Sequence, residues 1–148
     1  MDNKLVEKGK YIYNEIQARD KTKLMIKNLE QNLRDCELKY EDCMGVHSVQ
    51  FNNVVHKQNN FEKSSIANSI LSDEQRIEMQ IKFLKLQLRY REDLYLSVIN
   101  FYDGLDKQFL IDCFSGKFST EGLKSKYYET NPYKKVIRLL GQAKIELL

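Results

Sequence analysis

The sequence feature that most limits the fold is a long run of apolar side chains spaced three and four positions apart. This run extends from Ile77 to Tyr102 and is interrupted only by Arg91. Such a spacing returns to one face of an α-helix at every step. A single proline in 148 residues leaves few places where a helix must end, and it argues against a turn-rich β-sandwich. We therefore expect an all-α protein. The positions of the run are Ile77, Ile81, Leu84, Leu88, Arg91, Tyr95, Val98 and Tyr102.

A second apolar stripe lies on the same predicted helix, which we expect to span 73–102. Ser72 and Gln75 have the spacing of a capping box, which places the start of the helix near Ser72. Two stripes on one helix need two covering elements: the first helix can cover one, and the C-terminal segment or another copy of the chain must cover the other. We expect an oligomer, most simply a homodimer, with a compact monomer as the alternative. The second stripe consists of Met79, Phe83, Leu86, Tyr90, Leu94 and Phe101.

The first 45 residues predict another long helix, which ends at Gly45. Arg19 and Lys23 interrupt its seam. The next segment, 46–68, is rich in Asn, Gln, Ser and His and has no sustained period, which predicts an irregular loop. Residues 1–105 are thus expected to form a body of two long coiled-coil-like helices joined by the loop 46–68. The seam of the first helix is Leu5, Ile12, Ile16, Ile26, Leu29, Leu33, Cys36, Tyr40 and Cys43.

Residues 106–148 predict a small helix-turn-helix module. Ser119 or Thr120 is expected to cap a short helix that ends at Tyr127 or Tyr128. After a turn, Asn131 is a good N-cap and Pro132 a good first residue for a last helix, 132–148. The side chains of this helix that we expect to face inward are Val136, Leu139, Leu140, Ala143 and Leu147.

The charge excess of the chain lies in this module. The net charge is +3, and residues 106–148 carry eight basic and five acidic side chains. Within 131–144 there are four basic residues and no acidic one, which is the local field that a nucleic-acid contact requires. The alternative is a solvated face without a ligand. The candidate DNA-binding residues are Asn131, Tyr133, Lys134, Lys135 and Arg138.

The stretch from Phe109 to Leu148 resembles a sigma-factor region 4-type helix-turn-helix. The order of a coiled-coil-like first half, a polar loop, a long middle helix and this module is similar to the phage-encoded ArpU/RinA-like transcription regulators of Gram-positive bacteria. This resemblance implies a DNA-binding transcription regulator of a phage or mobile element. It is most specific at Leu123, Tyr127, Val136, Arg138, Ala143 and Leu147.

Two positions depart from that pattern. Lys124 stands where such modules usually have a small residue, and the turn before Tyr133 contains Pro132 and is a residue longer than usual. These departures keep a second hypothesis open. In it the chain is a non-enzymatic interaction module, an adaptor or inhibitor of RNA polymerase or another host protein, that uses the apolar faces of 73–102 and a degenerate helix-turn-helix.

Enzyme function is the least favoured class, because the sequence has no P-loop, GxSxG, HExxH or CxxC motif. Cys36, Cys43, His47 and His56 could in principle hold zinc, but the two cysteines lie in the apolar seam, where Cys acts as a small hydrophobe. We expect no catalytic residue, metal or cofactor. Without an apolar run of membrane-spanning length or a signal peptide, we expect a cytoplasmic protein with no membrane contact.

Overall fold

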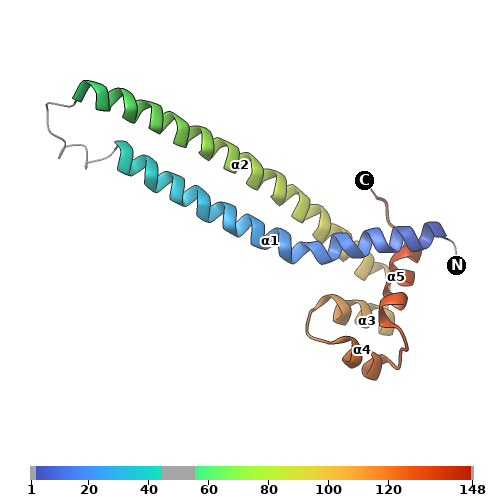
Figure 1. The fold of residues 1–148 in the computed structure, drawn as a ribbon. Coiled ribbons are helices and arrows are strands. Elements are labelled where there is room, and N and C mark those ends of the chain that lie inside the picture. The colour runs from blue at the N-terminus through green and yellow to red at the C-terminus, as the bar shows by residue number, and fades with distance from the viewer. Residues whose placement is uncertain (1–2, 45–55, 148) are drawn as a thin grey trace. The chain divides into compact units, whose positions relative to one another are not determined.

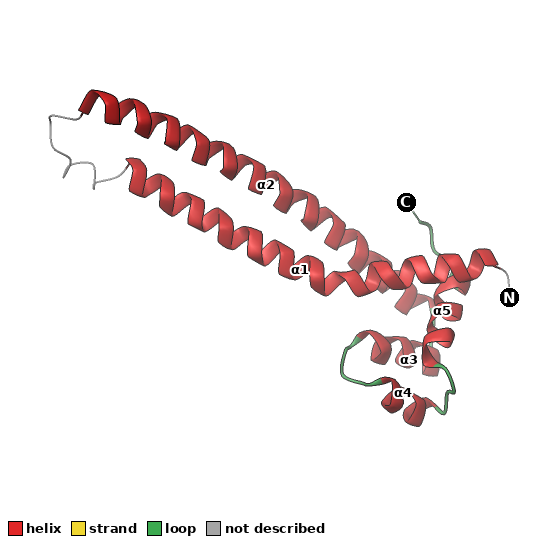
Figure 2. Cartoon of the chain, in the orientation of Figure 1, coloured by secondary structure: helices red, strands yellow, loops and turns green. Residues whose placement is uncertain are grey.

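The computed structural model describes residues 3–44 and 56–147, and the side chains within 3–42 and 66–147. The described residues form helices joined by short loops and contain no strand (Figure 2). The all-α prediction is therefore confirmed. The helices are α1 (Asn3–Met44), α2 (His56–Phe101), α3 (Gly104–Phe114), α4 (Thr120–Tyr127) and α5 (Pro132–Gln142), as labelled in Figure 1.

The chain divides into two compact units. Unit 1 combines Met1–Lys21 with Gln87–Leu148, and unit 2 is Thr22–Leu86. Both α1 and α2 pass from one unit into the other. This division differs from the expected boundary between 1–105 and 106–148, because the two long helices contribute to the core of the C-terminal module.

Unit 2 consists of two antiparallel helical segments, the second half of α1 and the first part of α2 (Figure 1). They bury one narrow face each, which includes Ile26 on α1 and Ile81 on α2. Lys85 and Glu30 form an ion pair across the two segments at 3.7 Å. The seams predicted from Ile26 to Tyr40 and from Ile77 to Leu84 are the less exposed faces, as expected from their spacing.

Unit 1 contains the larger core. Phe109, Leu110 and Leu140 are fully buried, and they pack with Ile12 of α1 and Val98 of α2. Five helical segments thus contribute apolar side chains to one cluster. Polar contacts at its edge include an ion pair from Arg91 to Glu15 at 2.9 Å and a hydrogen bond from the Tyr102 hydroxyl to the carbonyl of Leu139.

The helices α1 and α5 approach each other closely within unit 1 at two glycines. A Cβ atom placed on Gly9 would lie 2.2 Å from the carbonyl oxygen of Ile137, and one on Gly141 would lie 2.2 Å from that of Leu5. Lys8 also donates a hydrogen bond to the carbonyl of Ala143 at 2.8 Å. Glycine is required at both positions because any side chain would collide with backbone atoms.

Several sequence expectations about helix bounds are wrong. Residues 56–68 are helical, so the loop predicted over 46–68 is wrong there, while 46–55 lies outside the described residues. The run from His56 contains no glycine or proline, so nothing forces a loop. Because α2 begins at His56 and ends at Phe101, Ser72 does not cap it and its range is not 73–102.

The last helix is also shorter than predicted. It ends at Gln142 instead of extending through 132–148, because Ala143 adopts an extended conformation with ψ 131°. As a result Ala143 is buried as expected, but Leu147 is exposed. No helix among the described residues combines the length and the apolar character needed to span a membrane.

Candidate nucleic-acid interface

The helices α3, α4 and α5 pack against one another, and their ends are defined by local hydrogen bonds. Ser119 caps α4, since its Oγ accepts a hydrogen bond from the Gly122 amide at 3.1 Å. Asn131 caps α5 in the same way, since its Oδ1 accepts from the Lys134 amide at 3.1 Å. Pro132 is the first residue of α5. Both caps and the position of Pro132 are as predicted, and Pro132 therefore belongs to the helix and not to the turn.

The turn between α4 and α5 consists of residues 128–131. Tyr128 is in the left-handed conformation with φ 55° and is almost fully exposed. Its amide and that of Glu129 both donate to the carbonyl of Lys124, which closes the C-terminal end of α4. A position in the left-handed conformation normally favours glycine, so the tyrosine at 128 carries a small amount of backbone strain.

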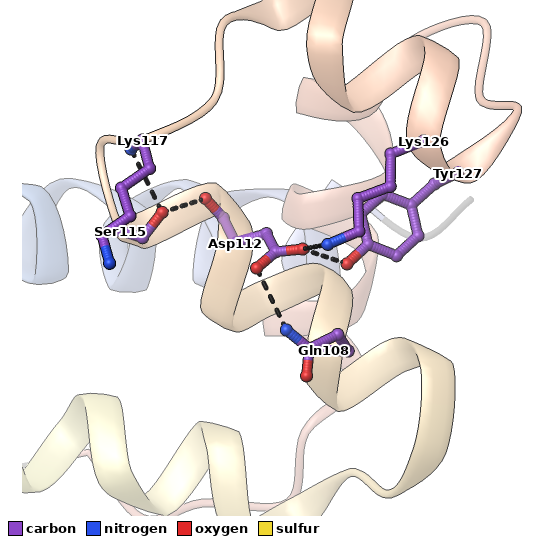
Figure 3. Close-up of polar contacts among 6 residues, drawn as sticks. All are labelled: Gln108, Asp112, Ser115, Lys117, Lys126 and Tyr127. Atoms are coloured by element: carbon purple, nitrogen blue, oxygen red, sulfur yellow. Dashed lines mark hydrogen bonds and ion pairs between the residues drawn. The ribbon is translucent and has the colours of Figure 1, made fainter.

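A buried carboxylate joins α3 to α4. Asp112 accepts hydrogen bonds from Gln108 at 3.1 Å, from the ammonium of Lys126 at 2.7 Å and from the hydroxyl of Tyr127 (Figure 3). Its side chain is only 8% exposed. Desolvation raises the pKa of Asp112, but the hydrogen bonds from Lys126, Tyr127 and Gln108 together outweigh it, and the pKa is lowered. The carboxylate therefore stays charged and fixes the packing of α4 on α3.

The same carboxylate also affects its neighbours. Burial and the hydrogen bond to Asp112 raise the pKa of Tyr127, so its hydroxyl remains a donor. The Ser115 hydroxyl donates to the Asp112 carbonyl at 2.8 Å and accepts from the Lys117 amide at 3.2 Å (Figure 3). These contacts hold the beginning of the loop between α3 and α4.

The two faces of α5 differ sharply. Its buried face contacts the core of unit 1 through Val136, Leu139 and Leu140. On the opposite side Lys134 and Arg138, one turn apart, are both exposed. With Asn131 they line a shallow hollow of about 160 Å³ at the start of the helix, and Lys135, Glu129 and Thr130 complete its lining. The structure thus brings three of the five candidate DNA-binding residues together on one exposed strip.

The other two candidates have internal contacts. The Lys135 side chain is 15% exposed; its ammonium pairs with Glu129 at 2.9 Å and lies 3.9 Å from Asp106 and 4.7 Å from the ring centre of Phe109. Tyr133 is half-exposed, and its ring packs edge-on against Tyr13 with centroids 5.2 Å apart. The charge of Lys135 is already balanced by nearby carboxylates, whereas the Tyr133 side chain remains half-exposed.

Three functional or structural roles were not apparent from the sequence. They are the carboxylate of Asp112, the close contacts of Gly9 and Gly141, and the approach of Lys135 to Asp106, and each depends on a partner on another helix. One signal was available for Asp112, because it is a single acid inside the apolar run from Phe109 to Phe114. A charged residue in such a run indicates a buried partner.

Unit 2 carries an apolar surface of a different kind. Met79, Phe83 and Leu86 are 72%, 60% and 66% exposed. Beside them lies an open groove of about 450 Å³, lined by Met25, Asn28, Leu29, Gln80, Phe83 and Leu84. The second apolar stripe predicted on α2 is therefore uncovered over this part of its length. Leu94, further along the stripe, is buried in the core of unit 1.

The cysteine and histidine set considered for zinc lies mostly outside the described side chains, since only Cys36 belongs to them. Among the described side chains, no group of three or more His, Cys, Asp or Glu residues is arranged to hold a metal ion.

No protein-family model, curated protein or solved structure matches the chain.

Proposed function

We propose that the protein is a DNA-binding transcription regulator that contacts double-stranded DNA with α5. The observation that carries the proposal is the capped helix α5, which follows α4 after a four-residue turn and exposes Lys134 and Arg138 on the side away from the core. This is the order of elements in a helix-turn-helix, whose second helix enters the major groove by its N-terminal turns. The resemblance of Phe109–Leu148 to regulators encoded by phages and mobile elements supports the same function.

The chemistry of the exposed strip fits DNA. Arg138 can donate two parallel hydrogen bonds to a guanine edge or to a phosphate, and Lys134 can pair with a phosphate. Asn131 and the exposed edge of Tyr133 lie near the start of the helix, where the helix dipole favours an anion. Lys135 is assigned a structural role instead, because Glu129 and Asp106 neutralise it.

The test is DNA binding by the whole chain, measured by fluorescence anisotropy with labelled fragments of its own genomic neighbourhood and unlabelled competitor DNA. We expect a specific, salt-sensitive complex. Replacing Lys134→Ala and Arg138→Ala together should weaken it at least tenfold and reduce the salt slope by about two. The matched control, Lys27→Ala with Lys82→Ala, removes the same charge from exposed positions of unit 2 and should preserve binding.

Two results would contradict the proposal. One is that the chain carrying Lys134→Ala and Arg138→Ala binds the cognate fragment as tightly as the unaltered chain. The other is binding that shows no preference among fragments and is lost by about 0.15 M salt, which is typical of nonspecific charge attraction.

A second candidate function is favoured by the uncovered face of unit 2. In it the groove beside Phe83 takes an amphipathic helix of another protein, such as a subunit of RNA polymerase. Binding to purified RNA polymerase that is lost in Phe83→Glu, but kept in the exposed control Gln75→Glu, would favour this function. A shift to monomer in Phe83→Glu by light scattering would instead identify the occupant as a second copy of the chain.

A further inference from the structure

A cavity of about 460 Å³ lies in unit 1, between α1, α3, α4 and the start of α5. Its volume falls in the range of small-molecule sites, which is roughly 300–1,000 Å³. It adjoins the exposed strip of α5 at Asn131, which lines both. The residues that line it are Tyr13, Cys113, Phe118, Thr120, Leu123, Lys124, Thr130, Asn131, Pro132, Tyr133 and Val136.

Aromatic rings form one part of the lining. Tyr13 and Tyr133 meet edge-on with centroids 5.2 Å apart, and Phe118 belongs to the loop before α4. Phe118 and Tyr133 are both partly exposed although they are large and apolar. A planar ring placed among them would find edge and face contacts on several sides, which aromatic pairs favour.

The polar part of the lining favours a negative charge. It includes one cationic residue, Lys124, and two hydroxyl-bearing residues, Thr120 and Thr130, and no lining residue is acidic. Lys124 forms an ion pair with Glu121 at 3.3 Å, and the Glu121 side chain is 83% exposed. Such a surface ion pair contributes little to stability, so a ligand carboxylate can take the place of Glu121 beside Lys124.

Cys113 does not add a competing anion. Burial, followed by the charge of Asp112, raises the pKa of its thiol to about 12. The thiol is therefore neutral near pH 7 and acts as part of the apolar wall.

We propose that this cavity binds a small aromatic carboxylate, with its ring among Tyr13, Phe118 and Tyr133 and its carboxylate on Lys124. The site goes beyond the proposed DNA contact and does not depend on it. Because Asn131 lines the cavity and also belongs to the exposed strip, we expect an occupied cavity to affect the start of α5. Ligand binding and DNA binding are therefore expected to be linked, and linkage is reciprocal.

The experiment is a titration of the full chain with benzoate, followed by amide chemical shifts and calorimetry. Shifts should concentrate at Leu123, Thr130 and Val136. The uncharged isostere benzamide should bind roughly tenfold more weakly, because it cannot form the charge-assisted hydrogen bonds. Benzylamine, which carries the opposite charge, should not bind measurably at the same concentrations.

Lys124→Met keeps most of the side-chain volume and removes the charge, so it should lower the benzoate affinity roughly tenfold, as benzamide does for the unaltered chain. Lys117→Met is the matched control, since Lys117 is an exposed cation nearby that does not line the cavity. Thr120→Trp, at an exposed position on the rim, should fill the cavity and prevent binding while the helical circular dichroism is kept. The ligand measurements need no DNA, so their outcome is independent of the DNA-binding test.

The inference is overturned if benzoate at millimolar concentration causes no shifts at the lining residues. It is also overturned if benzoate, benzamide and benzylamine bind equally, or if Lys124→Met and Lys117→Met have the same affinity. The comparison of the three probes uses the unaltered chain, so it remains decisive even if a variant fails to fold.

Discussion

Phe109 in unit 1 and Phe83 in unit 2 show how differently the two units treat the same kind of side chain. Phe109 is fully buried among five helical segments, whereas Phe83 is 60% exposed on a pair of helices. Two helices can cover only one face of each other, so an additional apolar stripe stays in solvent. Unit 1 adds three short helices, and there Leu94 of the stripe is buried and Tyr90 is partly buried, although Phe101 at the end of α2 is 42% exposed. Whether an apolar side chain is buried therefore depends on how many elements surround its helix, as well as on the spacing of apolar residues along that helix.

The largest expected effect tests this comparison directly. Phe109→Ala should lower the free energy of unfolding by about 4 kcal/mol, because it removes a fully buried ring and leaves a cavity. Phe83→Ala should change it by no more than about 0.5 kcal/mol. Urea denaturation followed by circular dichroism measures both. Similar losses in the two variants would mean that the face of unit 2 is covered in solution.

The close contact of α1 with α5 supplies the next prediction. Gly141→Ala places a methyl group against the carbonyl of Leu5. It should lower the free energy of unfolding by about 3 kcal/mol, because the backbone of α1 cannot move aside unless the two helices separate. Gly122→Ala is the control, since its new Cβ meets only side-chain atoms at 3.4 Å or more. A tolerated Gly141→Ala would show that the two helices are further apart than described.

A smaller effect is expected at the carboxylate of unit 1. Asp112→Asn should lower the free energy of unfolding by about 2 kcal/mol near pH 7, because Lys126 is left without its charged partner. The pKa of Asp112 is lowered on folding, so its contribution is complete above the unfolded value of about 3.9 and is lost as the pH falls through the folded value. The stabilities of the two proteins should therefore begin to converge as the pH falls below about 4, and they should meet only below the lowered folded pKa of Asp112. Thermal unfolding across pH 2–7 measures this, and a difference that is independent of pH would contradict the assignment.

The smallest expected effect distinguishes the role of Lys135 from that of the neighbouring Lys134 on α5. Lys135→Ala should cost about 1 kcal/mol, since Lys135 pairs with Glu129 and lies over the ring of Phe109. Lys134→Ala should leave stability within about 0.5 kcal/mol. Equal stability of the two variants in urea denaturation would return Lys135 to the candidate DNA-binding residues.

The sequence predicted what depends on near neighbours. The caps at Ser119 and Asn131, the first helical position of Pro132 and the seam from Ile26 to Tyr40 all follow from residues within one or two turns. The exposed pair Lys134 and Arg138 could also be placed, since they lie opposite the apolar stripe of α5. Local chemistry alone decides such features.

What the sequence could not supply were contacts between distant segments. Lys135 looked like Lys134 until Glu129, Asp106 and Phe109 were placed around it. The end of α5 at Gln142 was missed because the chain beyond it turns to an extended conformation without a proline. The early start of α2 was missed for the opposite reason, since a polar run without glycine or proline can be helical without an apolar period.

The glycine contacts between α1 and α5 have a consequence for the order in which the chain folds during synthesis. Gly9 meets Ile137, and Gly141 meets Leu5, so the partner of the first helix is translated more than a hundred residues later. Unit 2 is continuous in sequence and can pair its helices while the ribosome is still translating the rest. The glycine contacts of α1 can form only after α5 has emerged, whereas Ile12 can pack earlier against Val98 of α2. Closure of unit 1 is therefore the late step of folding, because it depends on the most distant contacts.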